Sequence, residues 1–562
     1  MQQASDSHTD LNTVRDSVES VWIAIVLAFV LRAFFVEAFV IPTGSMAPRL
    51  MGEHWDLQCP NCSFEYPYGY PQAARGDSRQ PRRGDALTPS DAQCPNCGFA
   101  FASGPPEVRK DFVNAGDRVL VMKYLYDFMP PQPWDVVVFR NPQNNQENYI
   151  KRLIGLPGET IEIVHGDIFY IPPGDDGKWR IRRKPLKAQE AMWQVVYDND
   201  YRPLKDAAKQ WSDKASPDRW DLTASGATLG GRRLVFKGEG SGELALEASE
   251  DDFLPVYGYN SPEGERKQID EHTDIVSDLK LMATFVPKAP TSALWLHLSS
   301  LEHRFQANVK ADGTFTVSHS AALEGDVWDS WTAPGSKVPA LSLDRGHVVA
   351  LVHVDFQVQL WIDGDCVFTS SDDQYAADHD ALAERISQVR SAGPDHKPLP
   401  MPMVRIGGDG GPFDLLHVRL MRDVYYTEAR GRLDSPPDGP LGEFARQLGV
   451  SRDTKAWGVM GNPIRLGDDS FFVLGDNSPQ SLDGRAWTSA APTLKLWKNP
   501  REDHARKPPG ENELDQLYQL GTVPRYNMIG KALFVYWPSG LRAPGLEFLP
   551  VVPNVGKMRL IR

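Results

Sequence analysis

In this chain of 562 residues, the stretch Ile41-Pro-Thr-Gly-Ser45-Met46 is the one by which the other segments can be assigned. It follows an apolar run that ends in β-favouring residues. Pro42 fixes one backbone angle and Gly44 has no side chain, so the backbone can turn sharply here and present the Ser45 hydroxyl. A serine hydroxyl is a poor nucleophile unless a base lies within hydrogen-bond reach. The sequence therefore has to supply that base from elsewhere in the chain.

The candidate base is Lys151, which lies in the block Tyr149-Ile-Lys-Arg-Leu-Ile154. Its neighbours Ile150 and Leu153 are apolar, so we expect its amine to be desolvated. Desolvation disfavours the ammonium form and lowers the pKa of a lysine toward working pH, where the neutral amine accepts the Ser45 proton. The alternative is a surface lysine on an edge strand.

Two further blocks are Asn114-Ala-Gly-Asp-Arg-Val-Leu-Val121 and Gly475-Asp-Asn-Ser-Pro-Gln-Ser-Leu-Asp-Gly-Arg485. In order and in spelling, the four blocks resemble the conserved boxes of bacterial type I signal peptidases, which are membrane-anchored serine proteases with a Ser/Lys dyad. One block alone is a weak signal, whereas four in order are specific. The resemblance implies a mainly β fold, with a signal-peptidase-type β catalytic domain behind one N-terminal transmembrane helix.

The resemblance also implies a role for each matching residue. Ser45 attacks the scissile carbonyl and forms an acyl-enzyme, while Lys151 activates first the serine and then water. Signal peptides are thereby removed from exported preproteins after an Ala-x-Ala-like site, and catalysis needs no cofactor. The other implied roles are oxyanion binding by Thr43 and the Ser45 amide; lysine orientation by Ser481 and Asp483, the latter paired with Arg485 or Arg152; structural support by Arg152, Asp476 and Arg485; and substrate binding by Phe39, Ile41, Met46, Leu50, Tyr149 and Ile150.

Two other functions compete with this interpretation. The first is a membrane-tethered binding protein with a vestigial dyad, and the joint retention of Ser45, Lys151, Ser481 and Asp483 argues against it. The second is a self-cleaving regulator with the same Ser/Lys chemistry. A membrane segment next to the serine disfavours that regulator.

The composition bounds the class of protein. Hydrophobic residues make up 41% of the chain and charged residues 24%, as in ordinary folded proteins. The length suggests roughly four structural units. The net charge of -14 argues against a nucleic-acid partner.

An apolar run precedes the serine. Val21 to Leu31 is uninterrupted, and Arg32 and Glu37 follow. Because a spanning helix needs about 20 mostly apolar residues, we expect a transmembrane helix over 18–41, or one that ends near Arg32. A cleaved export signal and a buried core helix are the alternatives.

The charges around this run do not set its orientation. The resemblance implies a single-pass protein of the cytoplasmic (inner) membrane with its catalytic domain on the exported side. The implied partners are signal-peptide-bearing preproteins, the lipid bilayer and the secretion machinery.

Four cysteines form two short motifs, Cys59-Pro-Asn-Cys62 and Cys94-Pro-Asn-Cys97. Two such pairs supply four thiolates, which suits tetrahedral zinc in a ribbon-like insert. The alternatives are two disulfides, if this region lies outside the cytoplasm, and Cys-x-x-Cys redox chemistry. We favour a structural zinc site formed by Cys59, Cys62, Cys94 and Cys97.

A large insert separates the lysine block from the block that begins at Gly475. Residues 186–217 show helical spacing. From 218 to 430 short strands alternate with turns, and this region resembles a concanavalin/laminin-G-like jelly-roll β-sandwich. Such sandwiches bind glycans or peptides in some families and are spacers in others. Cys366 is expected to be a small buried residue.

These assignments divide the chain into eight segments. They are a cytoplasmic segment (1–17), the transmembrane helix (18–41), a first catalytic segment with the nucleophile (42–57), the zinc-ribbon-like insert (58–104), a second catalytic segment with the general base (105–185), a helical connector (186–217), the β-sandwich (218–430) and a third catalytic segment (431–562).

Overall fold

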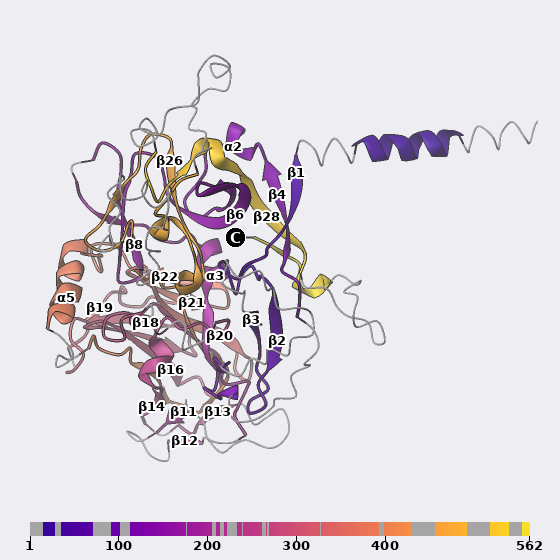
Figure 1. Ribbon diagram of the computed structural model, residues 1–562. Helices are drawn as coiled ribbons and strands as arrows, with labels where there is room; N and C mark the ends of the chain where they lie inside the picture. Colours follow the sequence, from indigo (N-terminus) through magenta and orange to yellow (C-terminus); the bar gives the residue numbers. More distant parts are fainter. Residues whose placement is uncertain are drawn as a thin grey trace, which may run out of the picture.

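The computed structural model is mainly β, and its strands form two large regions (Figure 1). The residues that it describes are 15–27, 35–70, 92–101, 113–175, 177–204, 210–213, 219–221, 233–238, 240–260, 266, 269–325, 327–392, 398–428, 456–491, 518–538 and 554–561.

The catalytic blocks meet on one antiparallel sheet. Its strand order is β1-β4-β28-β5-β6-β26-β27, and β29 pairs with β28. Strands far apart in sequence are therefore neighbours, and the chain returns to this sheet after the large insert. The strands are β1 (Val36–Val40), β4 (Arg118–Lys123), β5 (Val136–Asn141), β6 (Asn144–Gly155), β26 (Ser470–Leu474), β27 (Val523–Pro524), β28 (Met528–Trp537) and β29 (Arg559–Leu560).

Residues 117–124, 134–139 and 149–154 are short runs rich in β-branched residues, and this pattern predicts three strands. The structure confirms them as β4, β5 and β6. Val137 of β5 lies opposite Lys151 of β6, and Val138 lies opposite Ile150. In the sheet, β6 lies between β5 and β26. Lys151 thus sits in the interior of the sheet.

A second, smaller sheet continues from β6. It has the order β25-β7-β8-β9, with bounds β7 (Thr160–Val164), β8 (Asp167–Ile171), β9 (Arg180–Ile181) and β25 (Ile464–Arg465). The apolar, β-branched runs 160–164 and 167–171 predict a hairpin that turns at His165-Gly166, and β7 and β8 confirm it. Its turn residues His165 and Gly166 have φ values of 51° and 85°, as the two-residue turns that match the strand twist require.

The N-terminal region differs from the predicted helix over 18–41. Residues 15–27 are helical, residues 28–34 lie outside the described residues, and Val36–Val40 is strand β1, paired with β4. The predicted end of the helix is therefore wrong, since Val36-Glu-Ala-Phe-Val40 pairs along its whole length with a neighbouring strand. Within the described ranges, no helix has both the length and the apolar character needed to cross a membrane.

The cysteine motifs lie in a small unit with one hairpin, β2 (His54–Gln58) and β3 (Glu65–Gly69). The hairpin begins four residues before the predicted boundary at 58. The reason is packing, since Trp55 and Leu57 of β2 are buried with the four cysteines in one cluster. Residues 66–91 are rich in proline, glycine, arginine and aspartate, which predicts a long loop, but β3 occupies the start of this stretch. Residues 71–91 lie outside the described residues.

The large insert is a pair of antiparallel sheets packed around one core. One sheet has the order β12-β13-β24-β15-β20-β21-β22 with β10 on β24, and the other has the order β11-β14-β23-β16-β17-β18-β19. The bounds are β10 (Gln194–Asp198), β11 (Gln210–Ser212), β12 (Trp220–Asp221), β13 (Leu234–Phe236), β14 (Gly242–Glu247), β15 (Leu279–Pro287), β16 (Ser292–Ser300), β17 (His303–Lys310), β18 (Phe315–Ser320), β19 (Asp329–Ser330), β20 (His347–Val354), β21 (Gln357–Ile362), β22 (Asp365–Thr369), β23 (Val404–Gly410) and β24 (Phe413–Arg422).

The helical connector predicted over 186–217 is wrong beyond its first turns. Among the described residues of this range, only α3 (Leu186–Met192) is helical, and β10 and β11 belong to the two sheets. The cause is tertiary pairing, because Tyr197 and Trp211 are buried in the sandwich core and side-chain burial overrides local helical spacing. Cys366 is exposed, so its predicted burial is also wrong.

The remaining helices are short, apart from α5 (His379–Ser391), which the sequence interpretation missed. Asp378 caps α5, since its carboxylate accepts the Ala381 amide. The others are α2 (Leu125–Phe128), η2 (Glu250–Phe253), η3 (Ser478–Gln480), η4 (Gly484–Ala486), η6 (Arg525–Asn527) and η7 (Val555–Lys557).

Candidate active site

Ser45 and Lys151, 106 positions apart in the sequence, are in contact. Lys151 Nζ lies 2.5 Å from Ser45 Oγ. Both residues are buried, with 7% of Ser45 and 3% of Lys151 exposed. The structure thus brings together the two residues that the sequence predicts as nucleophile and base, in a protected environment.

The turn around Ser45 is closely packed. The Ala47 amide donates to the Gly44 carbonyl at 2.9 Å, which closes the turn. The Thr43 hydroxyl oxygen Oγ1 lies 3.4 Å from the predicted nucleophile, Ser45 Oγ. The oxyanion role of Thr43 stays a prediction.

Arg152 follows the lysine and makes a buried ion pair with Asp476 of the block that begins at Gly475. The Nε–Oδ1 and Nη2–Oδ2 distances are 2.7 and 2.6 Å, and Arg152 Nη1 donates to the Trp134 carbonyl at 2.8 Å. Burial alone would lower the pKa of Arg152, but the Asp476 carboxylate raises it. This two-pronged contact joins β6 to the loop that follows β26.

Asp483 pairs with Arg485, one of the two partners that the sequence predicts. Arg485 Nε and Nη2 donate to its carboxylate at 2.9 and 2.7 Å, and the Gly475 amide donates at 2.9 Å. Burial acts to raise the pKa of Asp483, yet the Arg485 guanidinium and these hydrogen bonds hold it below its ordinary value.

Ser481 lies beneath the nucleophile turn and is completely buried. A Cβ at Gly475 would lie 2.2 Å from Ser481 Oγ and 2.5 Å from the Ser45 carbonyl oxygen. Gly475 therefore lets its block, 475–485, approach the serine closely. The orientation of Lys151 by Ser481 and Asp483 stays a prediction.

The six predicted substrate-binding residues separate into two groups. Ile41, Met46 and Leu50 are buried in one apolar cluster, with Phe39 and Ile150 packed against it. Tyr149 packs in another cluster, with Phe139 and Trp487. The centroid of its ring lies 5.5 Å from Lys151 Nζ. Whether they contact a peptide stays a prediction.

The sequence interpretation missed two side chains at this site. Asn477 lies in block 475–485, and its amide nitrogen Nδ2 donates to the Gly44 carbonyl at 2.9 Å. Asn260 comes from the large insert and bonds to Asn477. Asn477 was visible within the matching block, whereas nothing in the sequence around Asn260 signals such a contact.

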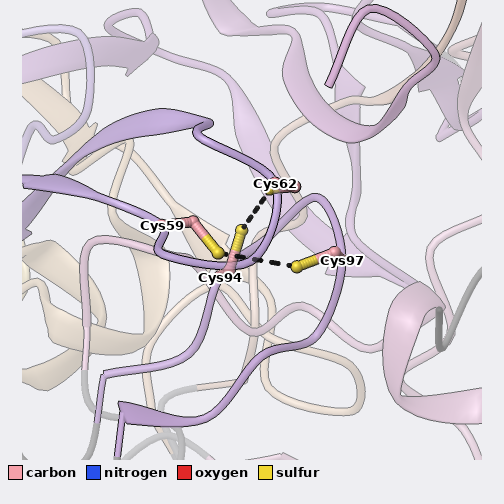
Figure 2. Close-up of side chains that lie close together, drawn as sticks. All are labelled: Cys59, Cys62, Cys94 and Cys97. Atoms are coloured by element: carbon pink, nitrogen blue, oxygen red, sulfur yellow. Dashed lines mark hydrogen bonds between the residues drawn. The ribbon is translucent and has the colours of Figure 1, made fainter. Parts of the chain in front are cut away.

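The four cysteines of the two motifs meet in space (Figure 2). Their sulfur atoms all lie within 4.8 Å of one another, and the Cys59–Cys97 and Cys62–Cys94 distances are both 3.6 Å. All four residues are buried, and none forms a disulfide. Four converging thiols of this kind are able to hold a metal ion.

Comparison with known proteins gives matches in the catalytic region. Residues 107–203 match the family described as signal peptidase, peptidase S26. A signal peptidase I from Rickettsia typhi is 28% identical over 159 residues, which cover 28% of this chain and 44% of that protein. A signal peptidase I from Leptolyngbya laminosa is 34% identical over 104 residues, which cover 16% of this chain and 49% of that protein. The chain thus spans about half the length of the curated relatives that it matches.

Solved structures match weakly. A carbohydrate-binding module from Bacillus subtilis, CBM66, is 11% identical, with a TM-score of 0.21, and covers 41% of this chain and 94% of its own. A laminarinase catalytic domain from Thermotoga maritima is 10% identical, with a TM-score of 0.23. The match covers 41% of this chain and 98% of that domain. At these TM-scores the likeness supports no conclusion.

The sequence matches include Lys151 and its strand, and the structure places block 475–485 and the serine turn around that lysine. Residues 107–203 are thus similar to the signal peptidase S26 family, and the curated relatives that match the chain are signal peptidases I.

Proposed function

We propose that this protein is a membrane-anchored endopeptidase that removes N-terminal signal peptides from exported preproteins by Ser/Lys acyl-enzyme catalysis. The observation that carries the proposal is the 2.5 Å contact between Lys151 Nζ and Ser45 Oγ. The match of residues 107–203 to the S26 family supports the reaction type.

The burial of Lys151 gives it the character of a base. Burial penalises the charged ammonium form of a lysine, so that the neutral amine becomes accessible near working pH. The 3% exposure of Lys151 places its amine in such an environment. A neutral amine in contact with Ser45 Oγ accepts its proton without rearrangement.

The reaction then has two stages. Ser45 Oγ bonds to the scissile carbonyl carbon as its proton moves to Lys151; the lysine then gives this proton to the leaving amine as the C–N bond breaks. In the second stage, water attacks the acyl-ester and transfers a proton to Lys151, which returns it to Ser45 as the ester bond breaks. The Ser45 amide and the Thr43 hydroxyl are the proposed donors that stabilise the oxyanion in both stages.

The peptide binds beside the dyad as an added strand. Phe39 and Ile150 are half-buried against the apolar cluster of Ile41, Met46 and Leu50, and they are the proposed lining of the adjacent face. Together with Tyr149, this surface favours small side chains before the scissile bond, as in an Ala-x-Ala-like site.

Anchoring in the cytoplasmic membrane, with the catalytic domain on the exported side, belongs to the proposal. Apolar side chains are exposed on the helix of residues 15–27, with 58% of Val21, 63% of Trp22 and 68% of Ile23 accessible. Exposed apolar side chains on a helix favour contact with lipid. The lipid bilayer and the secretion machinery are therefore the proposed surroundings of the protein.

The four-cysteine cluster is proposed as a structural zinc site. With zinc–sulfur bonds of about 2.3 Å, the sulfurs of a tetrahedral site lie about 3.8 Å apart, close to the 3.6 Å of Cys59–Cys97 and Cys62–Cys94. Disulfide sulfurs would be about 2 Å apart. A zinc ion closed in by four thiolates would clamp the two motifs together and would not enter the catalytic reaction.

The large insert is proposed to be a jelly-roll of the concanavalin/laminin-G type. Its two antiparallel sheets around a single core support this assignment. An experimental structure with another strand connectivity would refute it.

The test of the proposed function uses the full chain in detergent and a purified preprotein, with cleavage followed by gel shift and the cut site read by mass spectrometry. Wild type and Lys187→Ala, which alters an exposed lysine, are expected to cleave after an Ala-x-Ala site. Ser45→Ala and Lys151→Ala are expected to lose at least about 10³-fold in rate. Full activity in either variant would refute the dyad.

Metal analysis of the same preparation tests the zinc site. One zinc per chain is expected, with loss of the metal in Cys94→Ser. A metal-free protein with two disulfides by mass would refute it.

A further inference from the structure

A segment of the large insert, residues 257–260, contacts the turn that carries Ser45. Tyr257, Tyr259 and Asn260 are all buried. A Cβ at Gly44 would lie 2.4 Å from Cε1 of the Tyr259 ring. The ring of Tyr259 therefore covers the turn directly beside Ser45.

The same segment is anchored on the cysteine unit. The Gly69 amide of β3 donates to the Tyr259 carbonyl at 2.7 Å, and the Tyr259 hydroxyl donates to the Glu53 carbonyl at 3.2 Å. A Cβ at Gly258 would lie 3.0 Å from Pro95, inside the second cysteine motif. The backbone that leads into Asn260 is thus held against the cysteine unit through Gly258 and Tyr259.

Asn260 forms a reciprocal amide pair with Asn477 of block 475–485. Asn260 Nδ2 donates to Asn477 Oδ1 at 2.6 Å, and Asn477 Nδ2 donates to Asn260 Oδ1 at 2.9 Å. Both residues are buried. Because both ends of the Asn477 amide are engaged, its rotamer and its nitrogen are set by Asn260.

Asn477 in turn holds two consecutive carbonyls of the nucleophile turn. Its Nδ2 donates to the Gly44 carbonyl at 2.9 Å, and its backbone amide donates to the Ser45 carbonyl at 3.0 Å. The Gly44 carbonyl and the Ser45 N–H belong to one planar peptide unit and point in opposite directions. A hydrogen bond that fixes this carbonyl therefore fixes the direction of the Ser45 N–H.

We propose that Asn260 of the large insert is a positioning residue for catalysis, acting through Asn477 to aim the Ser45 N–H at the oxyanion. The inference rests on the proposed function, since it assigns the insert a role in that same reaction. A preorganised donor matters chiefly in the transition state. Loss of Asn260 therefore lowers kcat and leaves KM for the preprotein nearly unchanged.

The experiment is a double-mutant cycle on the full chain, with kcat and KM measured for Asn260→Ala, Asn477→Ala and the double variant. Asn260→Ala is expected to lower kcat by about 10- to 100-fold, with KM within about two-fold. The double variant is expected to match Asn477→Ala within about two-fold, because the two residues act in series. The matched control is Asn308→Ala, which removes a half-buried amide from β17 of the same insert.

Two outcomes would overturn the inference: a kcat of Asn260→Ala within two-fold of wild type, or losses that multiply in the double variant. If Asn260→Ala does not fold, Asn260→Gln replaces it in the cycle with the same reading, since the longer side chain displaces the pair.

Hydrogen exchange of the Asn477 backbone amide, which donates to the Ser45 carbonyl, separates this inference from the proposed function. If wild type cleaves no preprotein, the proposed function fails while exchange still reports on positioning. Faster exchange of this amide in Asn260→Ala than in Asn308→Ala supports the inference, and equal exchange overturns it.

Discussion

Asp476→Asn tests whether the buried pair with Arg152 holds the catalytic blocks together. The substitution keeps the shape of the side chain and removes its charge, which leaves the Arg152 guanidinium buried without a counterion. Arg152 is 0% and Asp476 1% exposed. Breaking one side of such a pair costs about 3–5 kcal/mol, a large share of the stability of a typical domain.

The matched control is Asp344→Asn, which breaks an exposed pair. Lys288 Nζ lies 3.0 Å from Asp344 Oδ1, and 73% of the Asp344 side chain is exposed. Exposed pairs contribute about 0–1 kcal/mol. The two substitutions therefore change the same chemistry in opposite environments.

Urea unfolding followed by tryptophan fluorescence measures both variants, with the transition of the catalytic sheet fitted by linear extrapolation. Asp476→Asn is expected to lose about 3 kcal/mol or more, and Asp344→Asn less than about 1 kcal/mol. An apolar double variant, Arg152→Met with Asp476→Leu, should recover much of the loss, because no charge is then left unpaired. A loss of less than about 1 kcal/mol in Asp476→Asn would refute the reasoning.

Two further predictions concern a histidine and a glycine. Burial acts to lower the pKa of His379, but its hydrogen bond to Glu162, at 2.7 Å, raises it above the ordinary value; the stabilisation is complete below about pH 6.5 and is lost as pH rises through the raised pKa. The thermal midpoints of wild type and His379→Gln should therefore differ at acidic pH and converge as the pH rises into the alkaline range. A difference that stays constant with pH would contradict this. Gly475→Ala should lower kcat at least about 10-fold, since its Cβ would lie 2.5 Å from the Ser45 carbonyl oxygen; cleavage rates at wild-type level would show that block 475–485 tolerates a shift.

The sequence predicts the catalytic strands well because their pattern is local. Short runs of β-branched and other apolar residues, bounded by glycine or proline, are enough to locate β4 to β8. The proximity of Ser45 and Lys151 is not local, and only the resemblance of the four blocks to a known family predicts it.

The errors arise where distant pairing decides the structure. The residues of β10 fit helical spacing, but their pairing with β24 makes them a strand. The predicted helix over 18–41 runs too far because Val36–Val40 pairs with β4. The contact of Asn260 with Asn477 joins positions 217 apart, and no pattern within either segment encodes it.

The most direct measurement of the central claim is the mass of the chain after rapid acid quench during turnover of a preprotein. An acyl adduct is expected on the peptide that contains Ser45, at a level reduced at least about 10³-fold in Lys151→Ala, because the serine then has no base at 2.5 Å. An adduct on another residue, or equal acylation of Ser45 without Lys151, would contradict the account.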